Sequence, residues 1–284
     1  MSAAPQLHDQ NARDLLSRRN FERLAKYINS YSGIQMPPTK LTMLEGRLRR
    51  RVRATGHANI EQYCTYLFDQ GGIDDESIHL IDAVTTNKTD FFREPQHFEF
   101  LTSIVLPAFL EQGRRSLRVW SAASSIGAEP YTLAMLLEEC RETTGLEYGI
   151  LATDLSTDVL AATHKGIYDA EMLAPVPPRL KQKYVLPARD PRSNKVRIHP
   201  TLRSRIACGR LNLMSEKYPV GNDMDIVFCR NVLIYFDKQT QAQVLHRLCE
   251  SLAPGGYLFV GHSETVSSFK LPLRAVAGTV LVKD

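Results

Sequence analysis

Small residues between an expected strand and an expected helix form the first chemically suggestive pattern, within residues 117–135. A β-type run reaches Trp120, small residues follow as far as Gly127, and Pro130 is expected at the first helical position, where its missing N–H would be unpaired anyway. A strand, a tight turn and a helix N-terminus form the nucleotide-binding crevice of doubly wound α/β sheets. An ordinary strand–helix connection remains the alternative.

Two carboxylates narrow what this crevice could hold. Glu129 lies in the turn, where it would repel a pyrophosphate but suits a cationic group, such as the amino group of an amino-acid cofactor, and the spacing is not G-x-G-x-x-G. Asp154 ends a second expected strand (149–152), where an acidic residue can accept both ribose hydroxyls. The alternative is that Asp154 caps the helix beginning near Thr157, but Ser156 can cap that helix instead.

Length and composition set the class of protein that carries these residues. The chain has 284 residues, 43% of them hydrophobic and 23% charged, which suits a soluble α/β domain with a smaller companion. Five scattered cysteines without a C-x-x-C pair indicate a reduced, cytoplasmic protein and give no zinc site. We see no apolar signal region and no run of membrane-spanning length, and the net charge of +4 permits an acidic partner.

The N-terminal part is expected to be helical. Residues 1–16 are interpreted as a flexible tail and 17–84 as an all-α domain, with Gly33 as the C-cap of its first helix. Its second expected helix (39–54) combines an apolar stripe with a group of arginines: Arg47, Arg49, Arg50, Arg51 and Arg53. A solvated helix face would explain them, but five arginines beside one glutamate favour a basic binding surface.

The rest of the chain is expected to form an α/β domain over residues 96–284, joined to the helices by a polar segment at 85–95. That segment is either a linker or part of the site. Residues 168–205 fit the α/β alternation poorly and are interpreted as an insertion, with an antiparallel pair at 196–198 and 205–207. A buried strand at 225–229 places Arg230 and Asn231 at its carboxyl end, and a last strand at 278–282 is expected to pair antiparallel.

Together these features suggest an S-adenosylmethionine-dependent methyltransferase. Amino-methyltransferases of adenine and cytosine need Asn/Asp-Pro-Pro-aromatic after the fourth strand, and residues 229–232 (CRNV) do not fit them. The chain resembles the CheR family, which methylates glutamates of bacterial chemotaxis receptors, over residues 17–282. The motifs that carry the resemblance are TTNKTDFFRE (85–94), WSAA (120–123), EPY (129–131), FCRNVLIYF (228–236) and GHSE (261–264).

The resemblance implies a doubly wound, Rossmann-like methyltransferase domain with a small N-terminal all-α domain and an inserted antiparallel β-subdomain. It implies that Arg93 and Tyr235 face the transferred methyl group, that S-adenosylmethionine is the cofactor and that S-adenosylhomocysteine is its product. The implied cofactor contacts are Asn87, Thr89, Arg93, Ala123, Glu129, Asp154, Leu155, Asn212, Leu213, Arg230 and Asn231.

The implied partner is the cytoplasmic helical domain of methyl-accepting receptors, whose acidic helices suit the arginine-rich helix; a monomer is expected, with no nucleic acid and no insertion into the membrane. Two departures from the family stand out. Ile126 and Ala128 replace a hydroxyl and a carboxylate of its usual S-T-G-E-E-P turn, which is expected to alter cofactor affinity. Residues 189–194 lack the glycines of members that dock a receptor C-terminal peptide, so that partner stays open.

The chemistry implied is simple. A glutamate acceptor is already ionised at neutral pH, because its pKa is about 4.3, so neither a general base nor a metal is required. Two other functions remain: methyl transfer to a small molecule or RNA, with the arginines binding phosphates, and a non-catalytic module that senses the cofactor.

Overall fold

The computed structural model describes residues 15–190 and 192–284, and the chain divides into two compact units, Met1–Thr86 and Asn87–Asp284. Residues 1–14 of the expected tail (1–16) lie outside the described residues. Leu16 is buried, and its backbone N–H donates to Glu45 Oε1 at 2.9 Å. The expectation of a loose tail is therefore wrong at Leu16.

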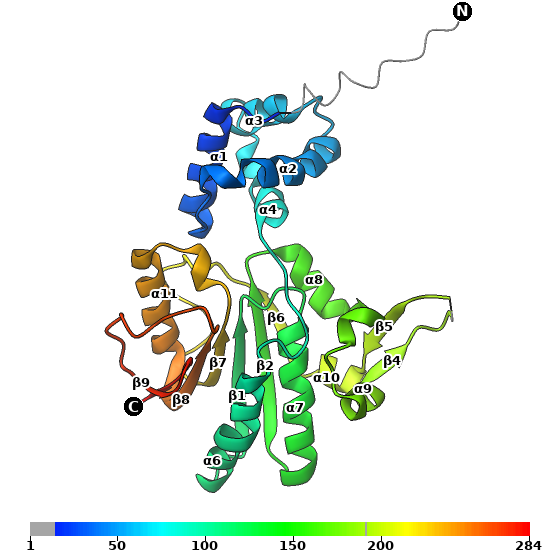
Figure 1. The fold of residues 1–284 in the computed structure, drawn as a ribbon, viewed down its shortest axis with the longest axis vertical. Helices are drawn as coiled ribbons and strands as arrows, with labels where there is room; N and C mark the ends of the chain where they lie inside the picture. The colour runs from blue at the N-terminus through cyan, green and yellow to red at the C-terminus, as the bar shows by residue number, and fades with distance from the viewer. Residues whose placement is uncertain (1–14, 191) are drawn as a thin grey trace, which may run out of the picture. The chain divides into compact units, whose positions relative to one another are not determined.

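The first unit is helical (Figure 1). Its elements are α1 (Arg18–Ser32), the 3₁₀ turn η1 (Pro38–Lys40), α2 (Leu41–Thr55), α3 (Ile60–Asp69) and α4 (Ile73–Val84). Ser17 caps α1 by accepting from Asn20 N–H, and Gly33 ends it in the left-handed region, as expected. The apolar stripe of α2 (Leu44, Leu48 and Val52) is buried.

A seven-stranded sheet forms the centre of the second unit. Its strands are β1 (Ser116–Ala122), β2 (Glu147–Asp154), β6 (Ile206–Arg210), β7 (Met224–Cys229), β8 (Leu252–Val260), β9 (Leu273–Ala277) and β10 (Val280–Lys283). Their order is β6-β2-β1-β7-β8-β10-β9, with the first five parallel and β10 antiparallel to its neighbours. The chain order reverses between β1 and β7, so a ligand crevice is expected at their carboxyl ends.

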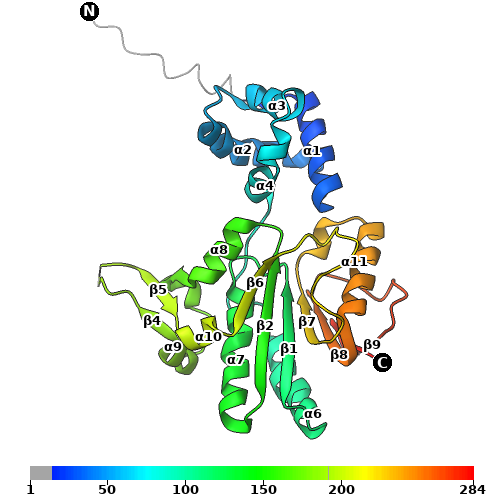
Figure 2. The same ribbon diagram turned by 180° about the vertical axis from the view of Figure 1, so that it is seen from behind.

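Helices pack on both faces of this sheet (Figures 1 and 2). They are α5 (Pro95–Phe100), the π turn η2 (Leu101–Val105), α6 (Leu106–Glu111), α7 (Ala128–Thr144), α8 (Thr157–Lys165) and α11 (Lys238–Ser251), with the 3₁₀ turn η4 (Leu233–Tyr235) before α11. Val119 and Phe228 join one core with residues of α5, α6 and α7. Trp120 and Val227 alternate with them and point to the opposite face. The doubly wound α/β fold is thus confirmed.

A small antiparallel sheet, in the order β3-β5-β4, forms the expected insertion. Its elements are β3 (Ile167–Asp169), η3 (Ala170–Leu173), α9 (Pro178–Tyr184), β4 (Val185–Pro187) and β5 (Lys195–Ile198), followed by α10 (Pro200–Arg203). The expected pairing of 196–198 with 205–207 is wrong. β5 pairs with β3 and β4, whereas β6 runs parallel to β2 in the main sheet.

Candidate active site

Unusual backbone conformations gather in three loops at the carboxyl ends of the strands and before α5. The described non-glycine residues with positive φ are Phe92 (53°), Glu94 (57°), Ala123 (58°), Ser125 (52°) and Asn231 (58°). Each such residue costs about 1–2 kcal/mol, so it persists only where its surroundings enforce it, as they do at binding and catalytic sites. Ser125 Oγ donates to the Asn87 carbonyl at 2.9 Å, which ties two of these loops together.

Arg230 joins the three loops. Its side chain is 2% exposed; Nη2 lies 2.9 Å from Glu94 Oε2, and Nη1 lies 3.1 Å from Glu129 Oε2. Nη2 also donates to the Arg93 carbonyl at 2.6 Å. A buried guanidinium is tolerated only when it is paired in this way. Arg230, which the family resemblance implied as a cofactor contact, therefore connects these three loops.

Glu94 is a site residue that the sequence interpretation did not assign a role. Its carboxylate accepts from Asn231 Nδ2 at 3.0 Å and from His262 N–H at 3.2 Å, in addition to Arg230. Burial alone would raise its pKa, but the hydrogen bonds from Asn231 and Arg230 outweigh burial and lower the pKa to about 2. Glu94 therefore stays ionised and fixes the segment before α5 against the end of β7.

Glu264 was also missed, and its role is to shape the backbone after β7. The buried carboxylate accepts from the N–H groups of Asn231 (2.9 Å), Leu233 (2.7 Å) and Gly261 (2.6 Å). Burial raises its pKa, and these backbone hydrogen bonds oppose the rise. Its place in the GHSE motif was the one available signal. Because Glu264 holds Leu233, it also fixes η4, at whose end Tyr235 lies.

Glu129 lies in the first turn of α7, which begins at Ala128. Pro130 is therefore the third helical residue, not the first as expected. Its missing N–H still costs the helix nothing, because the N–H groups of the first turn have no partner within the helix. Glu129 accepts from Ser121 Oγ at 2.7 Å as well as from Arg230. Burial raises the pKa of its carboxyl, and Arg230 opposes that rise.

Asp154 ends β2, as expected, and its side chain binds backbone N–H groups in the loop after β1 and at the start of α8. Its carboxylate accepts from Ser125 N–H at 2.8 Å and from Ser156 N–H at 3.0 Å. Ser156 occupies the N-cap position of α8, but its hydroxyl makes no capping hydrogen bond and lacks a partner in the described structure. The expectation that the Ser156 hydroxyl caps α8 is therefore wrong, although Ser156 does occupy the N-cap position, and the Asp154 bond to its N–H lies before the first helical residue.

Of the remaining predicted residues, Arg93 and Thr89 lie in the segment before α5, Leu155 follows β2, and Asn212 and Leu213 follow β6. Arg93 is half-buried, with Nη1 3.3 Å from the Lys88 carbonyl, and Thr89 is half-buried nearby in the sequence. Asn212 Oδ1 accepts from Met214 N–H at 2.9 Å, and the Leu213 carbonyl accepts from Tyr218 at 2.8 Å. Leu155 contributes its carbonyl to Arg210 at 3.1 Å.

The hydrogen-bond acceptors in and beside these loops fit S-adenosylmethionine. Glu129 and Asp154 offer acceptors for an ammonium group and for a ribose diol, respectively. The loop between them is built from Ala123, Ser124 and Ser125, whose short side chains let a ligand approach the backbone. Ser124 Oγ, in this loop, is buried and has no partner in the described structure.

The arginines of α2 divide into two groups. Arg47 donates to the carbonyls of Val84 and Thr85, the latter at 2.8 Å, and so holds the end of α4. Arg51 pairs with Glu76 at 2.7 Å. Arg50 and Arg53 are exposed, and Arg49 is half-buried.

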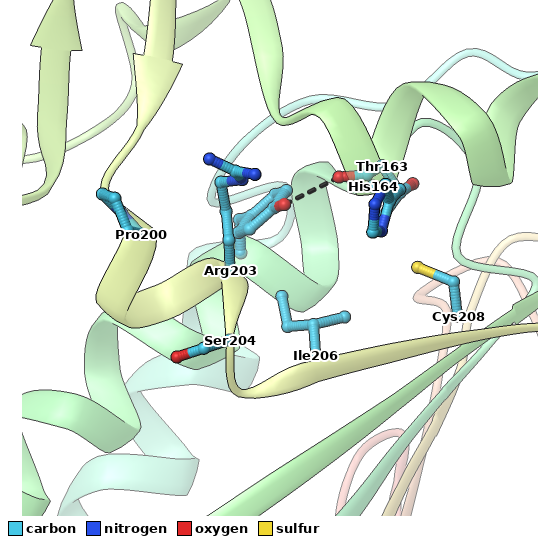
Figure 3. A pocket seen from close by; sticks show the side chains of 8 residues that line it. Thr163, His164, Pro200, Arg203, Ser204, Ile206 and Cys208 are labelled. Atoms are coloured by element: carbon cyan, nitrogen blue, oxygen red, sulfur yellow. Dashed lines mark hydrogen bonds between the residues drawn. The ribbon is translucent and has the colours of Figure 1, made fainter.

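A separate pocket of about 310 Å³ opens between α7, α8, α10 and β6. Figure 3 shows His164, Arg203 and Cys208 among the side chains around it. None of the predicted cofactor or acceptor residues lines this pocket, so it is distinct from the loops around Arg230. Within residues 15–190 and 192–284, no helix is long and apolar enough to cross a membrane.

Comparison with known proteins identifies relatives over most of the chain. The family model described as the SAM binding domain of CheR methyltransferase matches residues 87–282, and that of its all-alpha domain matches residues 19–85. The chain is 36% identical to a chemotaxis protein methyltransferase of Borreliella burgdorferi, covering 90% of this chain and 91% of the relative. It is 36% identical to the Escherichia coli chemotaxis protein methyltransferase, and the match covers 95% of this chain and 93% of that relative.

Proposed function

The chain belongs to the CheR family of S-adenosylmethionine-dependent methyltransferases, and from this premise we propose that it methylates glutamate side chains of bacterial chemoreceptors. The observation that carries the proposal is the Glu129–Arg230–Glu94 network, because it joins the Arg93 backbone to the loop that leads to Tyr235 and to the first turn of α7. The product is a glutamate methyl ester.

The cofactor would be held by the loops described above. When bound, S-adenosylmethionine supplies a methyl group on a sulfonium sulfur, and S-adenosylhomocysteine remains after transfer. Asp154 accepts hydrogen bonds from the ribose, and Glu129 faces the amino group. Asn87, Thr89 and Arg93 would contribute from the segment before α5, and Ala123 from the loop after β1. Leu155, Asn212, Leu213, Arg230 and Asn231 would contribute from the ends of β2, β6 and β7.

The acceptor needs alignment and no deprotonation. A glutamate carboxylate is ionised at neutral pH, since its pKa is about 4.3. Arg93 holds one carboxylate oxygen, and Tyr235 orients the groups around the methyl. Holding reacting atoms about 3–3.5 Å apart supplies much of the rate acceleration in such a reaction.

The receptor surface would be the acidic helices of the cytoplasmic domain, so the enzyme would act in the cytoplasm; we also propose that it acts as a monomer. The exposed arginines of α2, Arg50 and Arg53, suit such a surface better than Arg47 and Arg51, which hold α4. A receptor C-terminal peptide would add to an outer strand of the small sheet, β3 or β4.

The direct test is transfer of a labelled methyl group to receptor-containing membranes. The label should appear on receptor protein and be released as methanol by mild base, as expected for a carboxyl ester. Arg93→Ala, measured in parallel, should lose most of this transfer. Label on RNA or on a small molecule would support a different acceptor. Cofactor binding without any turnover would support the non-catalytic alternative.

A further inference from the structure

Three side chains with metal-binding atoms meet beside Arg230. They are Glu94, His97 in the first turn of α5, and His262 after β8, and their ligand atoms all lie within 4.8 Å of one another. Glu94 Oε2 lies 3.6 Å from His97 Nδ1 and 4.0 Å from His262 Nε2. Two imidazoles and a carboxylate form a ligand set that Zn²⁺ and neighbouring transition metals accept.

His97 gives an independent reason to expect a cation here. The residue is 3% exposed, and its Nδ1 has no hydrogen-bond partner in the described structure. Its Nε2 lies 2.7 Å from Thr279 Oγ1. In the tautomer whose Nε2 donates to Thr279, the Nδ1 lone pair is available to a cation held beside the Glu94 carboxylate. Metal-binding histidines are commonly oriented by such a hydrogen bond at the second nitrogen.

Access and charge set the character of the site. The His262 side chain is 46% exposed, so a hydrated ion can reach the cluster from that side. Arg230 opposes a cation, because its Nη2 lies 2.9 Å from the same Glu94 oxygen. A metal ion and Arg230 therefore compete for one carboxylate.

We propose that Glu94, His97 and His262 form a binding site for a divalent transition metal, with Zn²⁺ as the best fit, and that its occupation lowers cofactor affinity. The metal draws Glu94 away from Arg230, which also contacts Glu129, the residue assigned to the cofactor's amino group. The metal takes no part in methyl transfer. Metal binding does not depend on the proposed acceptor, so a failure of one proposal leaves the other standing.

The binding test uses the full chain, freed of metal by chelation and titrated with Zn²⁺ by calorimetry, with Co²⁺ as a spectroscopic probe. One equivalent should bind, and bound Co²⁺ should show the visible bands of a low-coordinate site. His262→Ala should weaken binding at least about 10-fold, as the loss of even an outer partner of a metal ligand does. His164→Ala, an exposed histidine elsewhere in the unit, is the matched control.

His97→Gln is the second variant, but His97 is buried, so the exposed His262 keeps the test decisive if the His97 variant fails to fold. Wild-type Zn²⁺ affinity in His262→Ala, or equal losses in His262→Ala and His164→Ala, would overturn the site. Coupling is measured by titrating S-adenosylhomocysteine with and without Zn²⁺. Each ligand should weaken the other by the same factor. Unchanged affinity at saturating Zn²⁺ would overturn the inhibitory role.

Discussion

Arg230 Nη2 lies 2.9 Å from Glu94 Oε2, and this ion pair joins segments 136 residues apart in the sequence. The guanidinium is almost completely buried, and loss of Glu94 would leave it with Glu129 as its carboxylate partner in the site. Removal of a partner from a buried charge is more costly than loss of an exposed pair. Glu94 also has a positive φ, so the pair holds a strained backbone in place.

We expect Glu94→Gln to weaken binding of S-adenosylhomocysteine about 10-fold, because hydrogen bonds to charged groups contribute about 1.5–3 kcal/mol and the amide keeps part of that contact. Glu94→Ala should cost more. Calorimetry gives the affinities, and Glu99→Gln, an exposed residue of α5, is the matched control. Wild-type affinity in both Glu94 variants would mean that the pair does not organise the cofactor site.

Asp154→Ala should weaken cofactor binding roughly 10- to 100-fold, from the loss of charged hydrogen bonds. Since Asp154 also holds Ser125 and Ser156, a loss of affinity alone does not identify a ribose contact. An S-adenosylhomocysteine analogue without the ribose 2′-hydroxyl separates the two roles in a double-mutant cycle. Wild type should bind the analogue less tightly, and Asp154→Ala should bind both ligands equally. Additive losses would count against the ribose assignment.

Much of the fold follows from local pattern, whereas the contacts that complete the site do not. The end of β2 at Asp154 could be predicted, and the β-type run to Trp120 falls within β1, because a strand, a turn and a helix leave signals within one short window. Glu264 could not, since it binds backbone amides of Asn231 and Leu233, 33 and 31 residues away. No spacing rule describes such a contact.

The errors have the same origin. Residues 205–207 have β-type composition, but their partner, β2, is brought to them only by the complete sheet. In the sequence, the arginines of α2 likewise form one run of positive charge, and the pattern does not show which of them are exposed. Which of them turn inward depends on α4, where Arg47 finds carbonyl groups and Arg51 finds Glu76.

Reversal of both exposed arginines, Arg50→Glu with Arg53→Glu, should raise the KM for receptor and leave cofactor affinity unchanged. Exposed charges act partly through encounter rates and are screened over about 8 Å at physiological salt. Receptor methylation by the wild type should therefore fall as salt rises. A wild-type KM in the double variant, together with a salt-independent rate, would mean that these arginines form an ordinary solvated helix face and do not bind the receptor.

The helical unit should lose stability in acid through Glu76. Burial would raise the pKa of this carboxyl, but hydrogen bonds from Arg51 and Tyr63 outweigh it and lower the pKa. A carboxyl with a lowered folded-state pKa stabilises the protein above its unfolded pKa of about 4.3, and this contribution is lost as pH falls further. Hydrogen exchange of α2–α4 in the full chain should show the loss, and Glu76→Gln should flatten it. An equally steep loss in Glu76→Gln would assign the acid sensitivity to other groups.

If catalysis is the alignment of an ionised carboxylate, the rate should not depend on a group that titrates near neutrality. It should fall below about pH 5, as the acceptor glutamate begins to take up a proton. Single-turnover rates across this range, at saturating cofactor, measure the chemical step. A steep dependence on a group with a pKa near 7 would require a general base and rule this mechanism out.

The two residues assigned to the methyl group should fail in different ways. Arg93→Ala should lower kcat and weaken cofactor binding together, because Arg93 is expected to contact both cofactor and acceptor. Tyr235→Phe keeps the ring but loses the hydroxyl, so it should lower kcat with little change in cofactor affinity, the pattern of an interaction made in the transition state. Both side chains are only partly buried, so both variants should remain folded, which circular dichroism checks. Full activity in Arg93→Ala, or a Tyr235→Phe variant whose defect lies entirely in cofactor binding, would contradict these assignments.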